Sequence, residues 1–244
     1  MTYCVGLQLE KGLVFMTDTR TNAGVDDVSQ ARKMHSWEVP GERVITLLSA
    51  GNLATTQAVV SLVDERTKAP GDRSPSILKA PSMFQVATIV GNILRDVVKD
   101  YEPSGPVSES VFSATLILGG QIKGSAQRLF LVYPEGNFIE STDDNRFFQT
   151  GETKYGRPIL VRALDADMSF EEAVKLLCVS FDSTIRANLS VDLPIDLTVH
   201  AVDDCKVTHE RRFERNDAYF QKVSKGWSDA LRTAVNSLPD FSFR

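Results

Sequence analysis

Hydrophobic residues along this chain follow two different periods, and the period changes several times between the ends. Short runs that alternate or stay apolar, bounded by Gly, Pro, Asn or Asp, predict β-strands. The predicted strands span residues 3–9, 13–18, 33–39, 43–49, 112–118, 127–133, 138–141, 193–202 and 205–213. Apolar residues at helical spacing predict helices over 53–63, 82–101, 154–166, 169–189 and about 216–238.

Local signals support this division into strands and helices. Ser169-Phe170-Glu171-Glu172 has the pattern of a capping box at a helix start. Residues 22–29, 68–81 and 103–106 are polar or rich in Pro, Ser and Gly, which predicts loops. Strands, two helices, strands, two helices, strands and a helix follow one another, an order typical of two stacked sheets with helices outside. We therefore expect an α+β fold, a four-layer αββα sandwich, forming a single domain over 1–244 with an added C-terminal helix at about 216–238.

Composition narrows the function classes. A net charge of −5 and a pI of about 5.3 argue against nucleic acid or an anionic membrane as partner. No apolar run approaches the roughly 20 residues that span a bilayer, and the start lacks a signal-peptide pattern, so we expect a cytoplasmic protein.

Other motifs favour structural roles. Three scattered cysteines lack the spacing of a zinc or redox site, so we expect buried thiols and no metal or cofactor. Three scattered histidines suggest no catalytic triad. Gly119 to Gly124 lies between two predicted strands, which predicts a hairpin turn and not a phosphate-binding loop.

Candidate chemistry lies at the start of the chain. If Met1 is removed, Thr2 carries a free α-amine beside its hydroxyl, which makes it a nucleophile with its own general base. The ordinary pKa of such an amine, about 7.7–8.0, leaves most of it protonated at pH 7. A nearby cation disfavours the protonated form, so this site needs a lysine and a carboxylate to position it. Asp18, which ends the second predicted strand, and Lys33, which begins the third, are the candidates.

These residues resemble a known family. A threonine start followed by Gly, an apolar strand ending in Asp-x-Arg, a loop Gly and a Lys near position thirty is similar to β-type proteasome subunits and HslV. The matching positions are Thr2, Gly6, Asp18, Arg20, Gly24 and Lys33. The resemblance implies an N-terminal nucleophile (Ntn) hydrolase in which Thr2 attacks, Lys33 and Asp18 tune its amine, and the Gly51 N–H stabilises the oxyanion.

Several details resemble the bacterial Anbu branch of this superfamily. These are the start Thr-Tyr-Cys-Val-Gly-Leu, residues 148–156, and Asn188-Leu189-Ser190-Val191 followed by residues 193–197. The helix beyond Asn216 has no counterpart in the compact HslV subunit. This resemblance implies self-assembly into a ring or spiral, with peptide or unfolded protein as substrate and no cofactor.

The sequence departs from the family pattern in two places. Lys33 follows Thr2 by 31 positions, one fewer than usual, and strict counting would place Met34 in the lysine position. A one-residue deletion in the loop 22–31 is the simpler interpretation, because loops absorb such changes.

The second departure concerns the family's auxiliary Asp-x-x-Ser. Its serine matches Ser190, but Ala187 stands where the acid is expected, and Asp182 is an alternative acid. Thr150 could replace a second auxiliary serine. The substrate pocket is expected around Thr46 and the loop after Asn22.

Three functions fit this sequence. The leading one is a threonine peptidase-type amide hydrolase in a self-assembling, proteasome-like particle. A non-catalytic assembly subunit and an Ntn amidohydrolase acting on a non-peptide amide are the alternatives. The mass of the N-terminus separates the first two, because a chain that starts at Thr2 favours the enzyme and a retained Met1 favours an inactive subunit. A panel of peptide and small-amide substrates separates the third.

Overall fold

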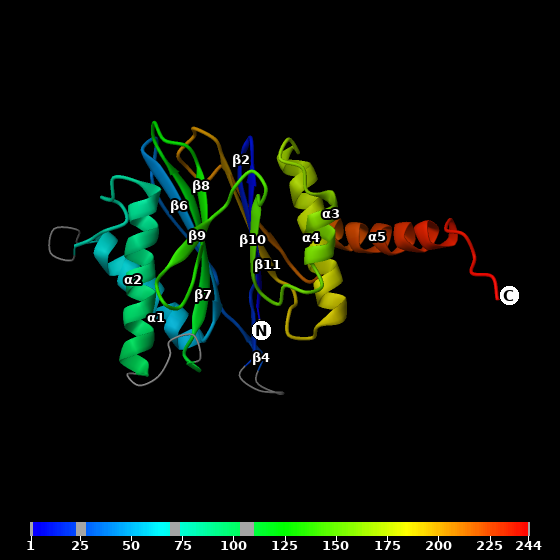
Figure 1. The fold of residues 1–244 in the computed structure, drawn as a ribbon, viewed down its shortest axis with the longest axis horizontal. Helices are drawn as coiled ribbons and strands as arrows, with labels where there is room; N and C mark the ends of the chain where they lie inside the picture. Colours follow the sequence, from blue (N-terminus) through cyan, green and yellow to red (C-terminus); the bar gives the residue numbers. More distant parts are fainter. Residues whose placement is uncertain (1, 23–27, 69–73, 103–109, 244) are drawn as a thin grey trace.

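Four central strands are buried almost throughout, which requires cover on both of their faces. They are β1 (Tyr3–Leu9), β2 (Gly12–Asp18), β6 (Arg43–Gly51) and β7 (Ala114–Ile122). The computed structural model describes residues 2–22, 28–68, 74–102 and 110–243. Two stacked sheets and outer helices cover these strands, as expected of a four-layer sandwich (Figure 1).

Each main sheet has five antiparallel strands. The first runs in the order β10-β1-β2-β11-β12, with β10 (Phe147–Gly151), β11 (Ile195–Ala201) and β12 (His209–Phe213). The second runs β5-β6-β7-β8-β9, with β5 (Met34–Val39), β8 (Arg128–Val132) and β9 (Phe138–Glu140). A small ribbon pairs β3 (Arg20–Asn22) with β4 (Val28–Gln30).

Helix pairs form the two outer layers. α1 (Leu53–Lys68) and α2 (Met83–Tyr101) cover the second sheet, and α3 (Arg157–Ala163) and α4 (Phe170–Ala187) cover the first (Figure 1). The capping box at Ser169 and Glu172 is present and starts α4. Within the described ranges, no helix is both long and apolar enough to cross a membrane.

The two sheets meet in an apolar layer that includes Cys4, Phe15, Leu48 and Ile117. A polar contact also joins the sheets at this interface. Nε2 of His200 lies 2.9 Å from Oγ1 of Thr46, and burial lowers the pKa of this histidine to about 3. The imidazole is therefore neutral near pH 7, as its apolar surroundings require.

The structure corrects several sequence-based boundaries. β10 was not predicted, and the helix predicted over 154–166 is limited to α3. The loop predicted at 22–29 contains parts of β3 and β4, while Gly24 and residues 103–106 lie outside the described residues.

The glycine motif at 119–124 is also not a turn over its whole length, because Gly119 and Gly120 lie inside β7. A Cβ on Gly120 would lie 2.1 Å from the Val44 carbonyl oxygen, and one on Gly119 would lie 2.7 Å from the Phe15 ring. These glycines permit close packing of neighbouring strands and of the two sheets.

The C-terminal helix α5 (Ala218–Asn236) projects away from the sandwich (Figure 1). Asp217 caps its start, and Phe220 is its one buried residue. Val223 also packs against the core, whereas Leu231 and Val235 are exposed. The apolar residues of this helix therefore pack on the core of the same chain only near its first turns.

Candidate active site

Thr2 lies immediately before β1, with 9% of its surface exposed. Its carbonyl oxygen accepts a hydrogen bond from the Glu152 N–H at 2.6 Å. The next N–H, that of Tyr3, donates to Oδ1 of Asp18 at 3.0 Å. The backbone around Thr2 is thus tied to β2 on one side and to the end of β10 on the other.

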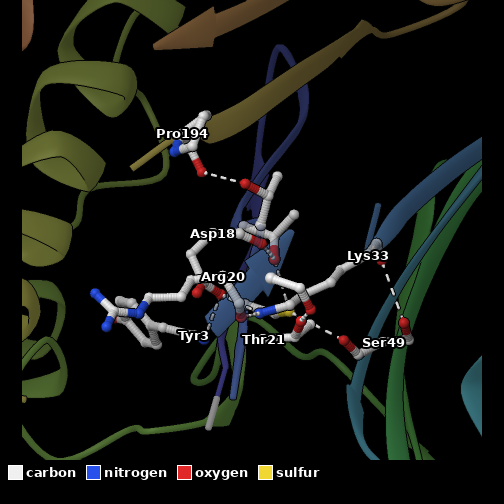
Figure 2. Close-up of polar contacts among 11 residues, drawn as sticks. Tyr3, Asp18, Arg20, Thr21, Lys33, Ser49 and Pro194 are labelled. Carbon is white, nitrogen blue, oxygen red and sulfur yellow. Dashed lines mark hydrogen bonds and ion pairs between the residues drawn. The ribbon is translucent and has the colours of Figure 1, made fainter. Parts of the chain in front are cut away.

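Strand pairing brings the predicted carboxylate to this position. Cys4 pairs with Thr17 in the β1–β2 register, which places Asp18 beside the start of β1. Nζ of Lys33 lies 2.9 Å from Oδ1 of Asp18 and 2.5 Å from the Arg20 carbonyl oxygen. Figure 2 shows the Lys33 side chain reaching from the opposite side of the site toward these two groups.

This ion pair is almost fully buried. Lys33 has 3% of its surface exposed and Asp18 has none. Burial raises the pKa of Asp18, while the Lys33 ammonium and the Tyr3 N–H act in the opposite direction and favour the carboxylate. Oδ2 of Asp18 is buried without a hydrogen-bond partner among the described residues. The carboxylate therefore depends on Lys33 for compensation of its charge.

The position of Lys33 also bears on the one-residue gap in its spacing. Met34, which strict counting favoured, is buried between the two sheets and pairs with Leu48 across β5 and β6. Lys33 is the residue that reaches Asp18. Its catalytic role stays a prediction.

Gly51 shares one cavity with Thr2 and Lys33. This cavity has a volume of about 650 Å³ and is also lined by Ser49 and Gly151. Gly51 has φ of +121°, and a Cβ there would lie 2.6 Å from both the Ser113 oxygen and the Ala114 Cα. Only glycine fits this backbone, so the predicted oxyanion residue has a conformation that other residues would disturb.

The predicted auxiliary residues do not line this cavity, and their roles stay predictions. Asp182 forms an ion pair with Arg186 at 3.1 Å on α4, and Thr150 pairs with Cys4 across β10 and β1. The backbone N–H of Ser190 donates to Oδ1 of Asn188. In the part of the chain that the structure describes, none of Asp182, Thr150 and Ser190 lines the cavity with Thr2.

The residues expected to line the substrate pocket are only partly found at this cavity. Thr46 is fully buried and bonds to Ser36 and His200, so it does not line the cavity. Ser49, from the same strand, lines it together with Asn52 and Leu53, and so does Ser29 from the predicted loop after Asn22. The loop after Asn22, apart from Val28 and the residues that follow, lies outside the described residues.

Sequence reasoning placed Glu152 and Asn188 within family-like segments but assigned them no role in the site. Glu152 is buried with 5% exposed, and its Oε2 accepts a hydrogen bond from Nδ2 of Asn188 at 2.8 Å. The available signal was the run Phe147-Phe148-Gln149-Thr150 before Gly151, which has strand character and a glycine stop. Reading this run as a strand would have placed Glu152 at a strand end beside β1.

The expectation of buried thiols is confirmed for the three cysteines. All three cysteines are free and buried, and burial raises the pKa of Cys4 to about 12, which keeps its thiol protonated. Across the described ranges, no group of three or more His, Cys, Asp or Glu side chains could hold a metal ion.

Comparisons with known proteins place this arrangement in a family. No model of a known protein family matches the sequence. Proteasome subunit beta of Haloquadratum walsbyi is 25% identical over 218 residues, which cover 87% of this chain and 79% of that protein. Anbu from Hyphomicrobium sp. strain MC1 is 50% identical, with a TM-score of 0.91 over 99% of this chain and 100% of that one.

Two further solved structures agree. Anbu (ancestral beta-subunit) from Yersinia bercovieri is 42% identical, with a TM-score of 0.93 over the whole of both chains. The helical assembly of the Anbu complex from Pseudomonas aeruginosa contains a chain that is 40% identical, with a TM-score of 0.90 over 99% of this chain and 98% of that one. The four-layer fold and these identities show that the chain belongs to the Anbu family of proteasome-type proteins.

Proposed function

We propose that this chain is a threonine peptidase-type amide hydrolase and a subunit of a self-assembling, proteasome-like particle. The observation that carries the proposal is the buried Lys33–Asp18 pair beside Thr2, in one cavity with Gly51. The 40% identity to the chain of the Pseudomonas aeruginosa helical assembly supports self-association. Peptide or unfolded protein is the proposed substrate.

The proposed reaction begins once Met1 is removed. Oγ of Thr2 adds to the amide carbonyl carbon while its proton passes to the α-amine of the same residue. The oxyanion accepts a hydrogen bond from the Gly51 N–H. The ammonium then protonates the leaving nitrogen as the C–N bond breaks, which leaves an ester on Thr2. Water, deprotonated by the amine, hydrolyses the ester and restores Thr2.

Lys33 and Asp18 act on the protonation state of the amine in this scheme. A cation close to the amine lowers its pKa, so more of it is free base near neutral pH. Asp18 fixes the position of Lys33 through the 2.9 Å contact and the burial of both side chains. General acid–base catalysis of this kind contributes roughly 10²–10⁴ in rate.

The test is a comparison of hydrolysis rates and N-terminal masses. The wild-type chain should begin at Thr2 and hydrolyse fluorogenic peptides or an unfolded protein. Thr2→Ala should abolish hydrolysis, Thr2→Ser should retain part of it, and Thr88→Ala, on the exposed face of α2, is the matched control. Hydrolysis that is unchanged in Thr2→Ala would contradict the mechanism, and a fully retained Met1 would favour an inactive subunit.

A further inference from the structure

Residues 151 and 152 wrap closely around the Thr2 carbonyl. Gly151 has φ of +85°, and a Cβ there would lie 1.9 Å from the Thr2 oxygen. The next N–H, that of Glu152, donates to the same oxygen at 2.6 Å. The end of β10 therefore forms a clamp, Gly151–Glu152, on the residue that carries the proposed nucleophile.

The Glu152 side chain holds this clamp in place through its own hydrogen bonds. Its Oε2 accepts a hydrogen bond from Nδ2 of Asn188 at 2.8 Å, and its Oε1 lies 3.4 Å from the Lys154 N–H. Over residues 2–22, 28–68, 74–102 and 110–243, no basic side chain forms an ion pair with Glu152. A buried carboxylate without an ion-pair partner needs hydrogen-bond donors, because otherwise it loses its hydration without compensation. Its hydrogen bonds therefore hold Glu152 in one position.

Asn188 connects the clamp to the end of α4. It is the C-cap residue of this helix, with its N–H bonded to the Thr184 carbonyl. Its Oδ1 accepts a hydrogen bond from the Ser190 N–H at 2.9 Å. A continuous set of hydrogen bonds thus runs from the end of α4 through Asn188 and Glu152 to Thr2.

We propose that Glu152 and Asn188 are positioning residues that hold Thr2 for attack. Their effect on the rate of attack by Thr2 rests on the proposed function. Terminal residues are poorly ordered unless they are tied down, and Thr2 becomes terminal when Met1 is removed. A misplacement of about 1 Å in a reacting group can cost about 100-fold in rate. The Glu152–Asn188 contact supports this tie by fixing the residue whose N–H binds the Thr2 carbonyl.

Two readouts test the proposal, both on full-length chain released from a ubiquitin fusion so that Thr2 is the first residue. The first is acylation by a β-lactone, in which Thr2 Oγ bonds to the carbonyl carbon, the ring C–O bond opens and the ring oxygen gains the proton. The second is hydrogen-exchange protection of the Glu152 amide, which reports the bond to Thr2 without any chemistry.

The expected pattern separates positioning from general stability. Glu152→Ala should lose about 100-fold in acylation rate and lose the amide protection, with kcat for peptides falling more than KM rises. Glu152→Gln should stay within about threefold of wild type, because its carbonyl still accepts from Asn188. Asn188→Ala should resemble Glu152→Ala. Glu135→Ala, an exposed glutamate in the β8–β9 turn, is the control.

Unchanged acylation and unchanged protection in Glu152→Ala would overturn the proposal. Equal losses in Glu152→Gln and Glu152→Ala would also overturn it, because keeping a side-chain oxygen that accepts from Asn188 would then have no effect on the rate or the protection. If wild type is neither acylated nor active, but protection is lost in Glu152→Ala and kept in Glu152→Gln, the proposed function is wrong and the tie to Thr2 stands.

Discussion

The Lys33–Asp18 pair allows a quantitative prediction, in which Lys33→Met removes the cation and keeps an unbranched side chain. Nζ of Lys33 and Oδ1 of Asp18 are 2.9 Å apart, and the two side chains are 4% and 0% exposed. Without Lys33, the Tyr3 N–H is the remaining hydrogen-bond donor to this carboxylate that the structure shows. Removing one partner of a buried pair destabilises by about 3–5 kcal/mol. This is a large part of the roughly 5–15 kcal/mol of a typical fold.

The loss should depend on pH in a defined direction. Burial raises the pKa of Asp18, and removing Lys33 removes the largest opposing effect. A carboxyl whose folded pKa lies above its unfolded value, about 3.9, stabilises the fold below that value. This stability is lost as the pH rises through the folded pKa. Lys33→Met should therefore be more destabilised near about pH 8 than near about pH 5.

Urea unfolding at fixed protein concentration measures this effect. The wild type, Lys33→Met, Asp18→Asn and the double variant form a cycle, and the double variant should be more stable than the sum of the single losses predicts. A loss below about 1 kcal/mol for Lys33→Met near pH 8, set against the expected cost of an unpaired buried charge, would refute the reasoning. An equal loss at both pH values would also refute it.

Two other predictions concern the backbone of the site and the interface between the sheets. Gly51→Ala should abolish amide hydrolysis and destabilise the fold by about 1–3 kcal/mol, because the new Cβ would clash with the backbone of residues 113 and 114 at a positive φ. Gly41→Ala is the control, because Gly41 also has a positive φ but a Cβ there would contact nothing within 4 Å, so activity should be kept. Hydrolysis that survives in Gly51→Ala would contradict the oxyanion role. The depressed pKa of His200, about 3 against an ordinary 6.5, means that stability is present above pH 6.5 and is lost as pH falls toward 3. His200→Asn should flatten this part of the stability profile in urea unfolding, and an unchanged profile would show that another group titrates.

The sequence predicted the layers well because both kinds of element carry strong periodic signals. The strand β2 and the helix α4 have continuous apolar faces and clear ends, and the capping box fixes the start of α4. β10 was harder to predict, because Phe147 and Phe148 sit in a short run between polar turns. Its role as an edge strand depends on β1, which lies far away in the sequence.

The site was only partly predictable for a similar reason. Asp18 and Lys33 could be named from their chemistry, since an N-terminal nucleophile needs a cation and a carboxylate nearby. Glu152 and Asn188 could not, because their relation to Thr2 arises when β10 pairs with β1 and α4 ends beside the same point. Ser190, inferred by matching a motif, donates its backbone N–H to Asn188, and its auxiliary role stays a prediction.

The location of a covalent adduct tests the central claim most directly. Wild-type protein with the mature N-terminus is incubated with a β-lactone, digested and mapped by mass spectrometry. The account predicts one adduct, on Thr2 as the first residue, and its absence in Thr2→Ala with Thr88→Ala as control. An adduct on another residue, or none on a chain that begins at Thr2, would contradict it.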